Sequence, residues 1–249
     1  MTTALVTGAS RGIGRAIARR LARDGALVAV HYATEAESAA ETVREIEANG
    51  GQAFAVQARF GAPGYVDDLF DAVESGLKAR TGTSTLDILV NNAGIKSVRE
   101  PEELTPQELD DLFEVNAKAP FLIIQRALGL LPDGARIITL SSGITRFGNP
   151  QEIGYAMSKG AVEQLSLHWA KHLGPRGITI NTVVPGVTDN GTEPVFRDPQ
   201  IRAHLSEMAA LKRVGEPTDI ADIVGFLAST DARWITGALI NASGGALLD

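Results

Sequence analysis

Residues 3–14 read TALVTGASRGIG, a short β-rich run that leads directly into a turn with glycines at positions 8, 12 and 14. After the turn, Ile13, Ile17 and Leu21 recur at helical spacing, so the stretch predicts a strand, a glycine-rich turn and a helix. Such a turn lets the backbone approach a pyrophosphate, and the helix N-terminus offers free N–H donors and a partial positive charge. Glycines can also serve only to make a tight turn. The strand–turn–helix context favours dinucleotide binding over that simpler role.

The same alternation of β-rich runs and helix-length segments continues to the end of the chain. Strands joined by helical crossovers are parallel and are covered on both faces. We therefore expect an α/β protein of one dinucleotide-binding and catalytic domain (residues 1–249), a Rossmann-type doubly wound parallel sheet of about seven strands with helices on both faces. The expected strands are TALVT (3–7), LVAVH (27–31), AFAV (53–56), DILVN (87–91), ARIITLS (135–141), ITINTVV (178–184) and ALINA (238–242).

Two stretches depart from this alternation of β-rich runs and helix-length segments. Residues 80–85, RTGTST, predict a polar loop, and residues 186–200 are polar and rich in turn-forming residues. After them, 201–211 predicts a short helix with Leu205, Met208 and Leu211 on one side. A long insertion between core elements is a usual place for a mobile cover over a site, so we expect a substrate lid at 186–211.

The composition excludes several classes of protein. The formal net charge of −7 argues against a nucleic-acid partner, which would require a basic surface. The absence of cysteine excludes disulfides, thiolate catalysis and cysteine–zinc sites. No run approaches the ~20 apolar residues of a membrane span, and the N-terminus lacks the pattern of a secretory signal. We expect a soluble, cytoplasmic protein with no nucleic-acid or membrane partner.

The residues after the second expected strand bear on which dinucleotide binds. A free ribose 2′-hydroxyl would usually meet a carboxylate there, but the chain has no acid before Glu35. Arg11, inside the glycine turn, could instead pair with a 2′-phosphate, although it could also be a solvated surface residue. We expect NADP(H) to be preferred, with NAD(H) as the alternative. The residues at this point are His31, Tyr32, Ala33 and Thr34.

A second informative stretch is GYAMSKGA, residues 154–161. If it is helical, Tyr155 and Lys159 share one face about one turn apart. The pair could be a packed phenol beside a solvated amine. It could also be a phenol that a nearby cation makes more acidic.

Six motifs occur together and in a fixed order: TGASRGIG (7–14), NNAG (91–94), Asn116 in EVNAKAPF, Ser142 in ITLSSG, Tyr155-Ala-Met-Ser-Lys159, and Pro185–Gly186. In this combination the chain resembles the classical short-chain dehydrogenases/reductases over essentially its whole length. It looks most similar to the 3-oxoacyl-acyl-carrier-protein reductases and to the polyketide or naphthol ketoreductases, and HYAT (31–34) resembles the phosphate-binding turn of the latter.

The resemblance implies a catalytic set of Ser142, Tyr155 and Lys159, assisted by Asn116. Ser142 is preferred to Ser141 because it precedes the tyrosine by the family's usual interval. The resemblance also implies a cofactor site. Its residues are Gly8, Ser10, Arg11, Gly12, Ile13, Gly14, Tyr32, Ala33, Thr34, Asn92, Ala93, Gly94, Tyr155, Lys159, Pro185, Gly186 and Val187, with Asn91 stabilising the central sheet.

The proposed chemistry requires an acidified phenol. A free tyrosine has a pKa near 10, and lowering it by about three units takes roughly 4 kcal/mol of preferential stabilisation of the phenolate. Lys159 and a positively charged nicotinamide in a sheltered site could supply this. Tyr155 would then donate the proton in ketone reduction, and Ser142 would donate a hydrogen bond to the carbonyl oxygen. The resemblance assigns Asn116 a water-holding role in a proton relay.

Some residues depart from the family pattern or call for another explanation. Relatives commonly carry an aspartate where this chain has Arg59, and often a threonine where it has Asn190. His168 and His172 have the i,i+4 spacing of a metal pair, but they lie on the helix face away from Lys159 and no third ligand is evident. We expect no metal there and place both at the surface or in a subunit interface.

These features predict an NAD(P)-dependent oxidoreductase acting on C=O or CH–OH groups, specifically an NADPH-dependent ketoreductase of a small-molecule ketone or a carrier-bound acyl substrate. The alternatives are an NAD-dependent dehydrogenase of a sugar or secondary alcohol, and a non-catalytic dinucleotide-binding sensor or scaffold. The family resemblance implies a homotetramer formed through 105–130 and 154–173, with GALINASGG at a second interface. The substrate is expected to lie among the lid residues and Ile95, Lys96, Ile144, Phe147 and Glu152.

Overall fold

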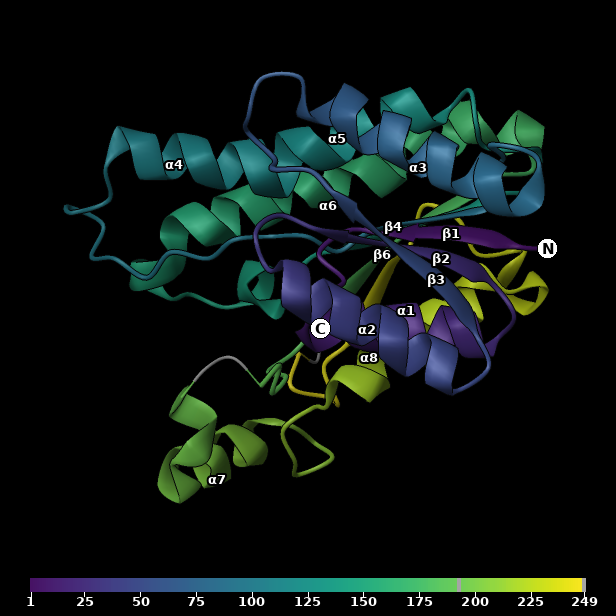
Figure 1. Cartoon of the computed structure of the whole chain (residues 1–249). Coiled ribbons are helices and arrows are strands. Elements are labelled where there is room, and N and C mark those ends of the chain that lie inside the picture. Colours follow the sequence, from purple (N-terminus) through teal and green to yellow (C-terminus); the bar gives the residue numbers. More distant parts are fainter. Residues whose placement is uncertain (192–193, 248–249) are drawn as a thin grey trace.

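A computed structural model of the chain describes residues 1–191 and 194–247. Its centre is a seven-stranded sheet in the order β3-β2-β1-β4-β5-β6-β7, in which every neighbouring pair is parallel. The chain first builds outward from β1 through β2 and β3, then crosses back to β4 on the other side of β1 (Figure 1). Ligands of doubly wound sheets bind beyond the carboxyl ends of the strands at this reversal. The expected α/β fold is confirmed.

All seven expected strands are present, and each strand end lies within one residue of its prediction. Long apolar runs are reliable here because most strands are buried on both faces by helices. The strands are β1 (Thr3–Val6), β2 (Leu27–Tyr32), β3 (Gln52–Gln57), β4 (Ile88–Asn91), β5 (Arg136–Leu140), β6 (Thr179–Pro185) and β7 (Leu239–Ala242).

Helices cover both faces of the sheet, as Figure 1 shows. The α-helices are α1 (Gly12–Arg23), α2 (Ala36–Ala48), α3 (Tyr65–Thr81), α4 (Pro106–Phe113), α5 (Ala119–Ala127), α6 (Ile153–Leu173), α7 (Pro199–Met208) and α8 (Pro217–Ala228). A π-helical turn, η1 (Glu114–Lys118), joins α4 to α5. The 3₁₀ turns are η2 (Gly143–Arg146), η3 (Pro150–Glu152), η4 (Gly174–Arg176), η5 (Pro194–Arg197) and η6 (Thr230–Ala232).

Alternate residues of the strands point to two hydrophobic cores. Ala4 and Val6 of β1 face α1, α2 and α8, whereas Leu5 faces α3, α5 and α6. The first core includes Ile17 on α1, and the second includes Phe70 on α3; both side chains are fully buried. Two cores of this kind fix the sheet from both sides and hold the carboxyl ends of β1, β4, β5 and β6 at one edge.

Two local predictions need correction. Residues 80–81 are not loop, because α3 continues to Thr81 and ends at Gly82, whose φ of +80° suits only glycine well. The helix expected at 201–211 instead spans Pro199–Met208, because the Asp198 side chain accepts the N–H groups of Gln200 and Ile201 and so starts the helix earlier.

The segment expected to be a lid contains α7, which lies at the periphery, outside both helix layers (Figure 1). The apolar side expected from Leu205, Met208 and Leu211 is largely uncovered, since Met208 and Leu211 are exposed. Residues 192–193 of the segment lie outside the described residues. Among the helices that the structure describes, none combines the length and apolar character needed to cross a bilayer.

Candidate active site

The glycine turn presents bare backbone at the carboxyl end of β1. Gly8 and Gly12 have φ values of +64° and +55°, in the left-handed region that favours glycine. A Cβ on Gly14 would lie only 2.2 Å from the Gly8 carbonyl oxygen. The turn therefore keeps its shape only with these glycines, and it opens onto the N-terminus of α1, where a pyrophosphate is favoured.

The NNAG segment is tied to this turn through Thr7. The Thr7 hydroxyl accepts the N–H groups of Asn92 (2.9 Å) and Ala93 (3.0 Å), and the Asn92 amide donates to the carbonyls of Thr7 and Gly8. The Asn91 side chain, for which a stabilising role was expected, is buried and has no hydrogen-bond partner among the described residues. Asn92 therefore makes the stabilising contacts here.

His31 links the carboxyl ends of three strands. Its Nδ1 accepts the Gly8 N–H at 3.0 Å, so the ring carries its proton on Nε2, which donates to the Ala58 carbonyl at 2.9 Å. The ring also stacks on Phe60 with centroids 4.6 Å apart. Burial lowers the pKa of His31 to about 4, so the ring is neutral near pH 7. No motif in the sequence indicated this role of His31.

The other residues expected at the adenosine end lie at the same edge of the sheet. Tyr32 is half-buried, and Ala33 and Thr34 are exposed. Arg11 and Arg59 are both exposed, and within residues 1–191 and 194–247 neither side chain forms a hydrogen bond or ion pair. Two cations without counter-charges suit a phosphate better than a free hydroxyl.

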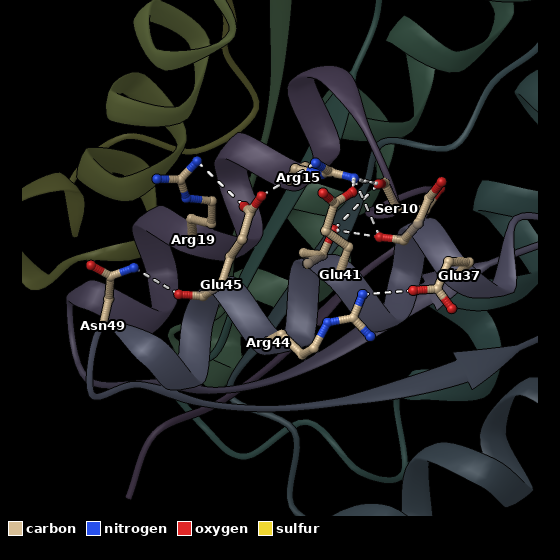
Figure 2. A network of polar contacts seen from close by, with 10 residues as sticks. Ser10, Arg15, Arg19, Glu37, Glu41, Arg44, Glu45 and Asn49 are labelled. Atoms are coloured by element: carbon tan, nitrogen blue, oxygen red, sulfur yellow. Dashed lines mark hydrogen bonds and ion pairs between the residues drawn. The ribbon is translucent and has the colours of Figure 1, made fainter.

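Arg15 holds the glycine turn against α2 (Figure 2). Its guanidinium donates to the Ser10 carbonyl from Nε (3.0 Å) and Nη2 (2.8 Å), and it pairs with Glu41 (2.9 Å) and Glu45 (3.4 Å) on α2. The Thr42 hydroxyl donates to the same carbonyl at 3.3 Å. Because Ser10 precedes Arg11, this network also fixes where the Arg11 backbone lies.

Tyr155 and Lys159 lie one turn apart on α6, as predicted. The Lys159 Nζ lies 6.0 Å from the centroid of the Tyr155 ring and donates to the Leu140 carbonyl at 2.9 Å. Lys159 is buried and Tyr155 is half-buried. Burial lowers the pKa of Lys159 to about 8, and the nearby Glu163 carboxylate opposes that shift. The expectation that the amine is close to the phenol is met.

Asn116 lies in the π-helical turn η1, a type of irregularity often found at functional sites. Its Oδ1 accepts the Ile95 N–H, and its Nδ2 donates to the Ile95 carbonyl (both 2.8 Å) and to Ser158 Oγ (3.0 Å). Ser158 in turn donates to the Tyr155 carbonyl at 2.8 Å. Asn116 thus joins the segment after β4 to the helix that carries the Tyr–Lys pair.

Gly94 lies beside both ends of this link. A Cβ added to it would lie 3.1 Å from Asn116 Oδ1 and 3.3 Å from Lys159 Nζ. Position 94 therefore favours glycine, because the Asn116 amide and the Lys159 ammonium occupy the space next to a Cβ. The structure places Asn116 near Lys159, as the resemblance implied, and it also places Gly94 beside both side chains.

The two serines after β5 have different surroundings. Ser142 is half-buried, and its Oγ accepts the Ile144 N–H at 3.3 Å at the start of η2. Ser141 is buried, and its hydroxyl donates to Glu163 Oε1 at 2.8 Å. Because Ser141 is engaged with a carboxylate, Ser142 remains the better candidate to contact a substrate.

Glu163 was missed by the sequence analysis. It lies on α6 four residues after Lys159, and its side chain is 6% exposed. Its carboxylate accepts hydrogen bonds from Ser141 and Thr145 and pairs with Arg146 at 3.0 Å. The i,i+4 spacing from Lys159 was the one signal available in the sequence.

β6 ends at Pro185, and the next residue, Gly186, lies close to Ser243 directly after β7. A Cβ on Gly186 would lie 2.7 Å from Ser243 Cα, so glycine is required by this approach. The Val187 carbonyl then accepts the Gly215 N–H at 3.0 Å.

The start of the expected lid reaches the glycine turn. A Cβ added to Gly12 would lie 3.3 Å from both the Cβ and the carbonyl oxygen of Asn190. Asn190, one of the departures from the family pattern, therefore lies against the phosphate end of the site.

The residues expected around a substrate differ in exposure. Ile95 and Phe147 are 41% and 45% exposed, whereas Ile144 is buried in the core and is a poor substrate contact. Lys96 and Glu152 form an ion pair of 3.0 Å between Nζ and Oε1. The available surface at this point combines apolar side chains with one ion pair.

His168 and His172 are exposed on α6, and His172 lies edge-on to Trp169. Within residues 1–191 and 194–247, no group of three or more potential metal ligands gathers.

Three features together fit a phosphorylated dinucleotide. They are a bare glycine turn at a helix N-terminus, two arginine side chains at the adenosine end without a partner among the described residues, and a buried amine beside a phenol.

Comparisons with known proteins agree with this arrangement. A family model described as enoyl-(acyl carrier protein) reductase matches residues 8–246. The 3-oxoacyl-acyl-carrier-protein reductase of Staphylococcus epidermidis is 40% identical over 245 residues, which covers 98% of each chain.

Three solved structures are more similar. The angucycline C-6 ketoreductase LanV with bound NADP is 59% identical, with a TM-score of 0.96 over 100% of this chain and 96% of that one. LanV is also known with bound NADP and rabelomycin, at 58% identity and a TM-score of 0.94 over 100% of this chain and 97% of that one. The promiscuous reductase LugOII, which catalyses keto-reduction at C1 during lugdunomycin biosynthesis, is 57% identical, with a TM-score of 0.97 over 100% of this chain and 98% of that one.

Proposed function

Because the chain belongs to the short-chain dehydrogenase/reductase family, we propose that it is an NADPH-dependent ketoreductase that converts a ketone of a polycyclic polyketide to a secondary alcohol. The observation that carries this proposal is the buried Lys159 ammonium 6.0 Å from the Tyr155 ring. A binding-only protein has no need of a buried amine beside a phenol, because burying a cation is costly.

The mechanism follows from the chain's own side chains. Bound NADPH supplies the hydride that adds to the carbonyl carbon. Tyr155 donates its phenolic proton to the carbonyl oxygen, and the Lys159 ammonium stabilises the phenolate left behind. Ser142 donates a hydrogen bond to the same oxygen, a contact that strengthens as negative charge develops there. Asn116 holds η1 and the segment after β4 against α6 and so orients the pair.

The preference for NADP(H) rests on charge. Arg11 and Arg59 carry no counter-charge within the described residues, and no acid precedes Glu35 at the end of β2. Arg11 would pair with the 2′-phosphate, and the Gly8–Gly14 turn would hold the pyrophosphate. Ala33 and Thr34, exposed at the same edge, would border the phosphate.

The substrate class rests on three observations. The two relatives at 57–59% identity are a ketoreductase of angucyclines and a reductase of lugdunomycin biosynthesis, whereas the carrier-protein reductase is 40% identical. Exposed Ile95 and Phe147 offer apolar contacts to a flat aromatic ketone. The net charge of −7 disfavours docking of an acidic carrier protein.

A panel of ketones tests this function. We expect NADPH consumption with a polycyclic aromatic ketone such as rabelomycin, at a kcat/KM at least about tenfold above that with NADH. The same assay would include 3-oxoacyl thioesters, an enoyl thioester, simple cyclic ketones and sugars. Turnover confined to thioesters would move the substrate to the acyl class, and an NADH preference above tenfold would reject the NADP(H) assignment.

We further propose that residues 1–249 form one catalytic domain, that 186–211 closes over the substrate, and that the protein works as a cytoplasmic homotetramer. Exposed apolar side chains support the assembly. Phe121 on α5 and Leu167 on α6 lie on the first expected interface, and Leu239 on β7 lies on the second. Trp234, 95% exposed, precedes that second region.

A further inference from the structure

Glu163 is a buried carboxylate directly behind the Tyr–Lys pair. It lies one helical turn beyond Lys159 on α6, with only 6% of its side chain exposed. A buried charge is costly unless it is paired and hydrogen-bonded. Here one oxygen accepts the hydroxyls of Ser141 and Thr145, each at 2.8 Å, and the other pairs with Arg146 at 3.0 Å.

All three partners come from one short segment, the end of β5 and the turn η2. Ser142 lies inside that segment, directly after Ser141 and at the start of η2. Thr145 Oγ1 also lies 3.0 Å from the Ser142 carbonyl. Glu163 therefore fixes the backbone on both sides of Ser142 to the helix that carries Tyr155 and Lys159.

Glu163 also acts on the charge of the site. Its carboxylate favours the protonated form of Lys159, against the effect of burial. Around Lys159, α6 contributes Tyr155 and Glu163, β5 contributes the Leu140 carbonyl, and η1 contributes neutral Asn116. Arg146 of η2 pairs with Glu163. Two further pairs of charged groups on neighbouring segments are joined in ion pairs, Glu114 with Lys118 on η1 and Lys96 with Glu152.

We propose that Glu163 is a positioning residue of the active site, which holds the Ser142 turn against α6 and supplies the negative charge that keeps Lys159 a cation. The inference rests on the proposed ketoreductase function. It adds that the charge acting on the Tyr–Lys pair is set by two further residues of opposite sign, the Glu163 carboxylate and the Arg146 guanidinium.

Two variants with opposite signs test the charge. Glu163→Gln keeps the size and one acceptor but removes a negative charge. It should lower the alkaline midpoint of the kcat–pH profile by roughly one pH unit, whether that midpoint reports Tyr155 or Lys159. Arg146→Met removes a positive charge and should raise the same midpoint. Glu47→Gln, on the exposed surface of α2, changes the net charge equally and should leave it unmoved.

A second readout does not depend on turnover. The phenolate absorbance of Tyr155, obtained by subtracting the Tyr155→Phe form of each variant, should titrate at lower pH in Glu163→Gln and at higher pH in Arg146→Met. Midpoints of both variants equal to wild type in both assays would overturn the inference. If Glu163→Gln fails to fold, an unmoved midpoint in Arg146→Met would overturn it alone.

A failure of the proposed function can be distinguished from a failure of this inference. A wild-type protein that reduces no ketone with NADPH would reject that function. If the wild type is active but the titration midpoints of Glu163→Gln and Arg146→Met equal those of wild type, only the inference about Glu163 would be rejected.

Discussion

Lys159 combines complete burial with a charge that the proposed reaction needs. Its pKa is lowered to about 8 by burial, and Glu163 opposes that change. Residues of this kind cluster at functional sites because their ionisation is set by their neighbours. At the residue scale, the protonation of Lys159 is therefore set by two opposing effects, the desolvation of its amine and the charges of its neighbours.

Arg11 decides between the two dinucleotides at the same scale. Replacing it with alanine removes one charge-assisted contact to the 2′-phosphate, worth about 1.5–3 kcal/mol. The KM for NADPH in Arg11→Ala should therefore rise at least about tenfold, while kcat/KM with NADH stays within about twofold. Arg23→Ala, at the exposed end of α1, is the matched control and should change neither. An equal loss with both cofactors would show that Arg11 does not read the phosphate.

His31 predicts a pH dependence of stability. Its pKa is lowered to about 4 in the folded protein and is near 6.5 when unfolded. The unfolded chain therefore binds the extra proton between these values, and stability falls as the pH falls from about 6.5 toward 4. We expect a loss of about 2 kcal/mol between pH 7 and pH 5 from this group alone.

Urea unfolding of wild type and His31→Asn at pH 7 and pH 5 checks this. The asparagine oxygen can still accept the Gly8 N–H but does not titrate. The variant should lose about 2 kcal/mol less than wild type between the two pH values. If the unfolding free energies of wild type and His31→Asn fell by the same amount between pH 7 and pH 5, the fold would not hold His31 neutral.

At the scale of elements, the glycine turn that the sequence predicted depends on a close approach between Gly14 and the Gly8 backbone, which the structure reveals. A Cβ on Gly14 would lie 2.2 Å from a backbone oxygen, which no side-chain adjustment relieves. Gly14→Ala should weaken NADPH binding by at least about tenfold and lower the unfolding free energy by about 1–3 kcal/mol. Fluorescence titration with NADPH and thermal unfolding measure both effects.

Gly129→Ala is the control, because a Cβ at Gly129 meets nothing within 4 Å. It should bind NADPH like wild type. Normal NADPH binding by Gly14→Ala would show that the turn can move to accommodate a side chain. That result would contradict the claim that NADPH binding depends on the close approach at Gly14.

The strands, α1 and the Tyr–Lys spacing could be predicted from the sequence because each is a local pattern. Apolar runs predict buried strands, and an i,i+4 spacing predicts a shared helix face. The start of α7 was misplaced because the Asp198 cap outweighs the apolar spacing of Leu205, Met208 and Leu211.

The missed residues have partners that are distant in sequence. Glu163 binds Ser141 and Thr145, which are 22 and 18 residues away, and His31 meets Gly8 and Ala58 at separations of 23 and 27. No periodicity encodes such pairs. They follow only from the packing of α6 on η2, and from the parallel register of β1, β2 and β3.

At the scale of the whole molecule, the family, the fold and the NADPH-dependent ketoreductase activity expected from the sequence are confirmed by the relatives. The individual site roles, the lid and the assembly stay predictions. The polycyclic ketone substrate likewise stays a proposal.

The assembly is tested by light scattering. The proposed homotetramer should show about four times the 26.3 kDa mass of one chain. Leu167, 57% exposed on α6, lies on the first expected interface, so Leu167→Glu should lower the mass. Ile201→Glu on α7 lies outside both expected interfaces and should not. A wild-type monomer would reject the proposal.

The claim on which the mechanism depends is that the Lys159 cation lowers the pKa of Tyr155. The direct measurement is the phenolate absorbance of Tyr155 against pH with NADP⁺ bound, using Tyr155→Phe for subtraction, in wild type and Lys159→Met. We predict a wild-type midpoint well below 10 and a rise of at least about one pH unit in Lys159→Met. The same midpoint in both proteins would contradict the mechanism.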